Sequence, residues 1–367
     1  MFNGDTTVSG SVTATKFIGD GSLLTNLPTG GDSPFSPNDT DSSGIQSATN
    51  TATGSYSTAM GNTTEASGGT STAMGKNTVA SGFSSTAMGN GTTASENYST
   101  AMGFDTTASG AYSTAMGYST TASGESSTAM GESPTASGTY STAMGYGTIA
   151  SGYSSTAMGA YTQASGLYST AMGDGTTASG VYSTAMGDGT TASDYGSTVI
   201  GQYNSSGSTV TNSATAFDTA NTAFVIGNGT GTGADASDAF KVMFNGDATL
   251  SNDLTVKGDI VISSDARLKA NIVSLGSTLA RLLLIDGKSY TMKKDGKQKI
   301  GVLAQDIQKV FPELVSTDDR DMLAVNYQGL VPVLINALKE QQSEINVLKE
   351  QEKRLERLEA IISKMDK

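Results

Sequence analysis

The feature that most constrains this chain is a pentapeptide, Ser-Thr-Ala-Met-Gly, that returns every 14 residues through the middle of the sequence. A second element, Ala-Ser-Gly, keeps the same phase and is altered only at Glu96 and Asp194. Ten copies of the pentapeptide begin at residues 57, 71, 85, 99, 113, 127, 141, 155, 169 and 183, and a degenerate copy begins at Ser197. A unit of this length cannot bury a core alone, so successive units must stack.

Each unit is predicted to be one coil of a β-solenoid. Because side chains alternate along a strand, Thr and Met of the pentapeptide share one face while Ser and Ala share the other. Gly61 and its equivalents are expected at a tight bend, where a Cβ atom would clash. Ala-Ser-Gly marks a second short strand and its turn.

The ten in-register methionines allow two interpretations. Thioether sulfur is a soft ligand and would suit a metal or a haem. The chain contains no His and no Cys to complete such a site, so we expect a stripe of flexible core side chains instead. Residues 39–44 match half of a calcium loop, but Asn50 stands where the closing acid is needed, which favours a solvated turn. No cofactor and no metal are expected.

The repeat pattern, Ser-Thr-Ala-Met-Gly-x-x-Thr-x-Ala-Ser-Gly-x-Tyr, resembles the head repeat of YadA-like trimeric adhesins. That family's unit carries Val-Ala-Ile-Gly where this chain has Thr-Ala-Met-Gly, and Thr198-Val199-Ile200-Gly201 is closest to the family form. The resemblance covers residues 55–203. It implies a mainly β fold, a trimeric left-handed parallel β-roll of eleven coils.

Charge is spread unevenly along the chain. Residues 1–263 hold 4 basic and 19 acidic residues, a net charge of −15, whereas residues 264–367 hold 17 basic and 15 acidic residues, a net charge of +2. The acidic first part offers no basic surface that would bind phosphates, so we expect no nucleic-acid partner. No apolar run is long enough to cross a membrane, so no membrane insertion is expected.

The flanks of the repeat region differ from it in composition. Residues 1–29 resemble a small β connector of fibre proteins, and the Gly/Asp/Ser/Pro-rich residues 30–54 are interpreted as a linker. Residues 204–263 lose the repeat but stay β-like, as expected for a neck. The opening Met1-Phe2-Asn3-Gly4-Asp5 recurs at residues 243–247, so Met1 is interpreted either as the natural start or as an internal residue of a longer fibre.

Residues 264–367 resemble the endosialidase-type intramolecular chaperone, a self-cleaving serine peptidase family found at the C-termini of phage tail spikes and fibres. The matching segments are Ser264-Asp265-x-Arg267-Leu268-Lys269, residues 300–306, Phe311-Pro312-Glu313-Leu314-Val315, residues 325–327 and residues 330–334. The resemblance implies an α+β domain that assists trimer assembly.

The same resemblance places the nucleophile on Ser264 and its assisting base on Lys269, with cleavage between Ser263 and Ser264. A lysine whose pKa is lowered by partial burial can accept the proton of a serine hydroxyl, so no histidine is needed. The reaction would occur once per chain, as a single-turnover autoproteolytic serine peptidase. In the alternative interpretation Ser264 only caps a turn.

Residues 329–365 are predicted to form one long amphipathic helix. Its apolar residues lie nearly on one a/d seam, namely Leu334, Leu338, Ile345, Leu348, Leu355 and Ile362. An exposed single helix would be marginal, so three chains are expected to pair here as a coiled coil. Such pairing would set the trimer register before a repetitive shaft closes.

These features favour a homotrimeric extracellular fibre that attaches to a host or surface. A phage tail fibre on a virion and a bacterial cell-surface fibre both fit, and the latter includes a trimeric adhesin whose chaperone stays uncleaved. The receptor, a glycan or a protein, cannot be named from the repeat. An ice- or surface-binding solenoid and a glycan-cleaving spike are further alternatives. The Thr-rich coils suggest the first of these, but strict Thr-x-Thr columns do not appear and several repeat positions carry Glu, Asp or Lys. No pair of carboxylates stands out in the repeats to support the second.

Overall fold

The computed structural model describes residues 36–37, 45–46, 49–293, 296–317 and 321–365. The chain divides into two compact units, Met1–Lys257 and Gly258–Lys367. The predicted connector, Met1 with its repeated motif, the calcium-like residues 39–44 and most of the predicted linker lie outside the described residues.

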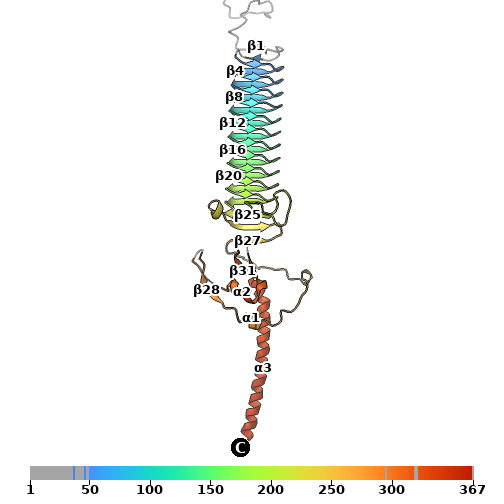
Figure 1. The fold of residues 1–367 in the computed structure, drawn as a ribbon, viewed down its shortest axis with the longest axis vertical. Coiled ribbons are helices and arrows are strands. Elements are labelled where there is room, and N and C mark those ends of the chain that lie inside the picture. Colours follow the sequence, from blue (N-terminus) through green and yellow to red (C-terminus); the bar gives the residue numbers. More distant parts are fainter. Residues whose placement is uncertain (1–35, 38–44, 47–48, 294–295, 318–320, 366–367) are drawn as a thin grey trace, which may run out of the picture. The chain divides into compact units, whose positions relative to one another are not determined.

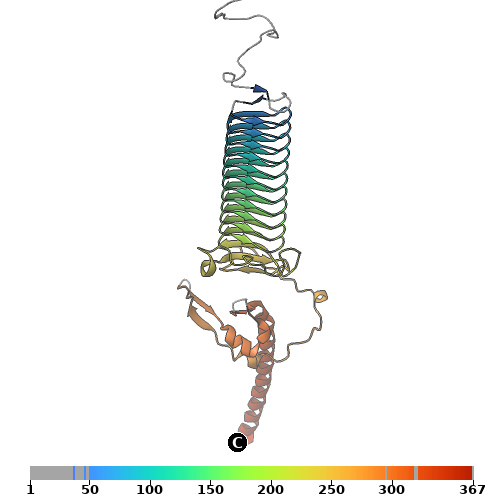
Figure 2. The ribbon, with the colours of Figure 1, turned by 45° about the horizontal axis from the view of Figure 1, so that its top comes forward.

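The first unit is a β-solenoid with two strands per coil (Figures 1 and 2). The longer strands form one parallel, in-register sheet, in which Thr, Ala, Met and Gly of each pentapeptide pair with the same residues of the next coil. They are β4 (Thr58–Asn62), β6 (Thr72–Lys76), β8 (Thr86–Asn90), β10 (Thr100–Phe104), β12 (Thr114–Tyr118), β14 (Thr128–Glu132), β16 (Thr142–Tyr146), β18 (Thr156–Ala160), β20 (Thr170–Asp174), β22 (Thr184–Asp188) and β24 (Thr198–Gln202).

The shorter strands form a second sheet of 11 strands, with two residues in each. They are β3 (Thr51–Ala52), β5 (Glu65–Ala66), β7 (Val79–Ala80), β9 (Thr93–Ala94), β11 (Thr107–Ala108), β13 (Thr121–Ala122), β15 (Thr135–Ala136), β17 (Ile149–Ala150), β19 (Gln163–Ala164), β21 (Thr177–Ala178) and β23 (Thr191–Ala192). At the N-terminal end, β1 (Ser36–Pro37) pairs antiparallel with β2 (Ile45–Gln46), which joins β4. The predicted mainly β solenoid is confirmed.

The fourth position of each long strand requires glycine. Gly61 has φ +133°, and a Cβ atom there would lie 1.9 Å from the carbonyl oxygen of Gly75 in the next coil. Coils that stack at the spacing of hydrogen-bonded strands leave no room for even one carbon at this position. The predicted clash is confirmed, but these glycines lie within the long strands rather than in a bend, since Gly61 is the fourth residue of β4.

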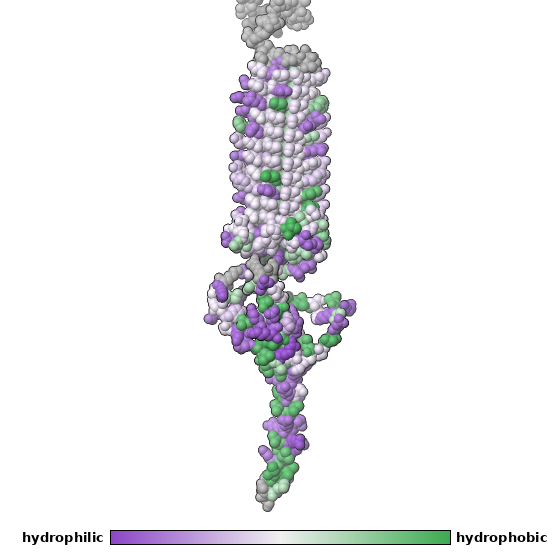
Figure 3. Space-filling view, in the orientation of Figure 1, coloured by the Kyte–Doolittle hydropathy of each residue, from purple (hydrophilic) through white to green (hydrophobic). Residues whose placement is uncertain are grey.

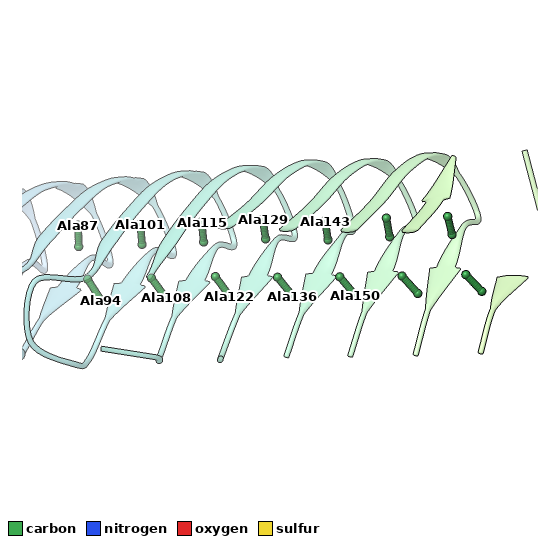
Figure 4. Packing of buried hydrophobic residues seen from close by; sticks show 14 of the residues in the cluster. Ala87, Ala94, Ala101, Ala108, Ala115, Ala122, Ala129, Ala136, Ala143 and Ala150 are labelled. Atoms are coloured by element: carbon green, nitrogen blue, oxygen red, sulfur yellow. The ribbon is translucent and has the colours of Figure 1, made fainter. Parts of the chain in front are cut away.

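The core of the solenoid consists of alanines, and the expectation of a methionine core is wrong. Ala59 and Ala66, together with their equivalents in every coil, have no exposed surface, and the two columns face each other between the sheets (Figure 4). Ser57 and Thr64 complete the inner face. A coil of 14 residues brings its two sheets so close that only small side chains fit, so the Thr and Met face points outward and is half-buried.

The solenoid ends in a short antiparallel extension. Strand β25 (Thr222–Asn228) continues the parallel sheet after β24, and it pairs with β26 (Asp238–Met243), which pairs with β27 (Ala248–Leu250). The turn η1 (Gly233–Asp235) connects β25 to β26. Buried Asp194 replaces the glycine of Ala-Ser-Gly in the last coil and accepts backbone hydrogen bonds from Thr211 and Thr222, at 2.6 and 2.8 Å.

The second unit combines short elements with one long helix. In chain order they are η2 (Ala266–Leu268), α1 (Leu279–Leu282), β28 (Lys288–Thr291), β29 (Gln298–Gly301), α2 (Ala304–Val310), η3 (Pro312–Leu314), β30 (Val315–Thr317), β31 (Leu323–Val325), η4 (Tyr327–Gly329) and α3 (Leu330–Met365). The antiparallel pairs are β28 with β29 and β30 with β31. Ile307, Phe311 and Val333 form the buried core. The predicted C-terminal helix is confirmed.

Candidate autoproteolytic site

The structure places Ser264 and Lys269 in direct contact. Lys269 Nζ donates a hydrogen bond of 2.7 Å to Ser264 Oγ. The turn η2 lies between them and folds the chain back, so that side chains five residues apart meet. The Ser263–Ser264 bond precedes this turn, and these residues are all exposed in the single chain.

Asp265 and Arg267 hold the turn in shape. The Asp265 carboxylate caps η2 by accepting a 2.8 Å hydrogen bond from the Arg267 backbone N–H. The Arg267 guanidinium also donates to both carboxylate oxygens, at 2.7–3.1 Å. These hydrogen bonds lower the pKa of Asp265 and raise the pKa of Arg267. The pair therefore stays ionised at neutral pH and stabilises the turn rather than supplying a base.

The structure adds a residue with a structural role, Glu340, that sequence reasoning missed. Its carboxylate accepts hydrogen bonds from the Ser277 hydroxyl (2.6 Å) and the Leu279 backbone N–H (3.2 Å), as well as from the Thr278 backbone N–H. These bonds lower the pKa of Glu340. The contact ties the start of α1 to α3 across more than 60 residues of sequence, so no local pattern could have revealed it.

Several of the segments that resemble the endosialidase-type chaperone help to build the core of the second unit. Phe311 is buried, and the Arg281 guanidinium lies 4.1 Å from its ring centroid while Arg281 Nε donates to the Val310 carbonyl at 2.9 Å. The Tyr327 hydroxyl accepts from the Val302 backbone N–H at 3.1 Å. These contacts assemble the small core against the first turns of α3.

Among the described residues, no group of three or more acidic, His or Cys side chains could hold a metal ion. In the same part of the chain, no helix is both long enough and apolar enough to span a membrane.

Two family models match the chain, and each match lies within one of the two compact units. The YadA head domain repeat matches residues 52–78, 80–106, 108–132, 136–162, 150–176, 164–190 and 178–204. The chaperone of endosialidase matches residues 264–316. No curated protein matches the chain.

The first unit is thus a β-solenoid whose coils are similar to the YadA head domain repeat, and the second unit contains a segment similar to the chaperone of endosialidase.

Proposed function

We propose that this protein is a homotrimeric extracellular fibre for attachment to a host or a surface, assembled by its own C-terminal chaperone and then cut before Ser264. The observation that carries the proposal is the union, in one chain, of YadA head repeats with an endosialidase chaperone domain. A stack of nearly identical coils can pair out of register, and a separate domain that fixes the register solves that problem.

Two surfaces support the trimer. The outer face of the long-strand sheet carries in-register columns of half-buried Thr and Met, a flat and weakly polar surface suited to a second copy. Apolar residues recur along the length of α3, where Figure 3 shows them in green. The six predicted seam residues are between 38% and 63% exposed in the single chain. Burying such side chains between three helices would stabilise the assembly.

The geometry of Ser264 and Lys269 supports the cleavage chemistry. Neutral Lys269 Nζ takes the hydroxyl proton, and Ser264 Oγ attacks the carbonyl carbon of Ser263. The C–N bond breaks as the proton passes to the departing Ser264 amine, which leaves an ester through Oγ. Water then hydrolyses the ester, freeing the Ser263 carboxylate and the Ser264 hydroxyl. The carbonyl is covalently adjacent to the nucleophile, which removes most of the entropic cost.

Exposure of Lys269 in the single chain links the chemistry to assembly. A lysine side chain can take a proton only in its uncharged form, and burial in a protein disfavours the charged form. Contact with partner chains would bury this part of the chain. Cleavage would therefore follow trimerisation, and the chaperone would leave only after its task is complete.

Light scattering on the full-length Ser264→Ala chain tests the assembly. A trimer has three times the 37.3 kDa mass of one chain, and that mass is the expected result. A monomer or a broad distribution of masses would count against the proposed fibre.

A further inference from the structure

One edge of the solenoid carries a column of tyrosines. The position before each pentapeptide lies in a turn with positive φ. It is occupied by Tyr56, Tyr98, Tyr112, Tyr140, Tyr168 and Tyr182, whereas Thr70, Ser84, Ser126 and Ser154 interrupt the column. In-register coils place successive members about 4.8 Å apart. Neighbouring rings therefore stack, with centroids 5.1 Å apart for Tyr98 and Tyr112 and 5.0 Å apart for Tyr168 and Tyr182.

At Ser154, where the column lacks a tyrosine, the ring of a neighbouring residue fills the gap. Tyr153, one position earlier in the chain, inserts its ring between Tyr140 and Tyr168. Its centroid is 5.4 Å from that of Tyr140 and 5.5 Å from that of Tyr168, with interplanar angles of 87° and 74°. A missing ring in the column thus leaves room for one ring-sized group.

The gap at Ser126 has the same spacing but a different neighbour. Tyr112 and Tyr140 flank it from two coils apart, and Glu125 stands where the other gap has Tyr153. Tyr112 and Tyr140 are 58% and 51% exposed, and among the described residues each stacks or packs only against a ring on the side away from the gap, Tyr98 and Tyr153 respectively. Within the described residues, the exposed Glu125 carboxylate makes no hydrogen bond or ion pair.

We propose that Tyr112, Tyr140 and Glu125 form a binding slot for an organic cation of the quaternary ammonium class. Two rings about 9.6 Å apart would place a central cation about 4.8 Å from each, within the range of cation–π attraction. The Glu125 carboxylate supplies the opposite charge at the open side, and the net charge of −15 over residues 1–263 attracts cations to the shaft. The slot depends on the solenoid alone and not on cleavage at Ser264.

Titration of the full chain with choline chloride at constant ionic strength, followed by NMR of the ligand, tests the proposal. We expect saturable millimolar binding of one choline per chain and none of 3,3-dimethyl-1-butanol, its neutral analogue. Tyr112→Ser should weaken binding about 2- to 5-fold, and Ser already occupies this column at positive φ, so the coil should fold. Glu125→Tyr should abolish binding by filling the gap as Tyr153 does.

Glu132→Gln is the matched control for Glu125→Gln. Glu132 also lies between tyrosines, because it pairs in register with Tyr118 and Tyr146, but it occupies the column itself and leaves no gap. We expect Glu125→Gln to weaken choline binding and Glu132→Gln to leave it unchanged. Equal losses in both variants, or equal binding of the neutral analogue, would overturn the proposal.

Discussion

At the scale of single residues, the solenoid depends on glycines, because their lack of a Cβ atom lets neighbouring coils approach closely. Two kinds of glycine occur near the end of the long strands, one within the strand and one directly after it. At Gly117, φ is +128° and a Cβ atom would lie 2.1 Å from the Gly131 carbonyl oxygen. At Gly175, φ is +59°, and a Cβ atom would lie 3.9 Å from its nearest neighbour, the Cα atom of Gly189. Only the first kind is required by close approach of two backbones.

Gly117→Ala should therefore destabilise the solenoid by at least about 2 kcal/mol, because the coil must open to admit the methyl group. Gly175→Ser is the control, since Ser119 and Ser133 occupy the same turn position with φ of 51° and 58°. Its cost should be within about 1 kcal/mol. Chemical denaturation followed by circular dichroism measures both, and equal losses would contradict the distinction between the two kinds of glycine.

At the scale of elements, the sequence predicted periodic features well and long-range contacts poorly. The 14-residue period predicts two strands per coil, and alternation correctly groups Ser with Ala and Thr with Met. Period alone does not say which face is inward. The small size of Ala59 and Ser57 was the available signal, because a narrow lumen excludes methionine. In the second unit, the contact of Ser264 with Lys269 was expected from a family resemblance, whereas Glu340 had no local signature.

The hydrogen bonds that Glu340 accepts from residues 277–279, called here the Glu340 clamp, should make the stability of the second unit sensitive to acid. Its hydrogen bonds lower the folded-state pKa below the ordinary value of 4.5, so its contribution is complete above that value and is lost as the pH falls through the folded-state pKa. Glu340→Gln should reduce stability at pH 7 and weaken the acid dependence. Hydrogen exchange of the Thr278 and Leu279 amides at pH 7 and pH 4 measures this, and an unchanged pH profile would count against the clamp.

The apolar seam of α3 predicts that substitutions at residues 348 and 350 will affect the trimer differently. Leu348→Glu places charge in the proposed three-helix core and should convert the Ser264→Ala trimer to a monomer or a loose mixture. Glu350→Gln changes an exposed side chain that contacts Lys353 at 2.8 Å on the same helix, and it should leave the trimer intact. Sedimentation velocity distinguishes them, and a stable Leu348→Glu trimer would show that the helix is not the assembly site.

At the scale of the whole molecule, the two units differ in sequence in a way that fits the different tasks proposed for them. The shaft is acidic, repetitive and built on alanine, which gives a long rod from little core volume. The second unit is nearly neutral in net charge and non-repetitive, and it carries the exposed apolar helix that can specify a partner register. In the proposed function, the unit that sets the register is no longer needed once the solenoid has folded, which gives the proposed cut its purpose.

Denaturing gel electrophoresis of the purified wild-type chain beside Ser264→Ala, with intact-mass analysis of each band, tests this account most directly. The wild type should give two fragments, one ending at Ser263 and one beginning at Ser264, while Ser264→Ala should run as a single band of 37.3 kDa. A wild-type chain that stays at full length, or a Ser264→Ala chain cut at the same bond, would contradict it.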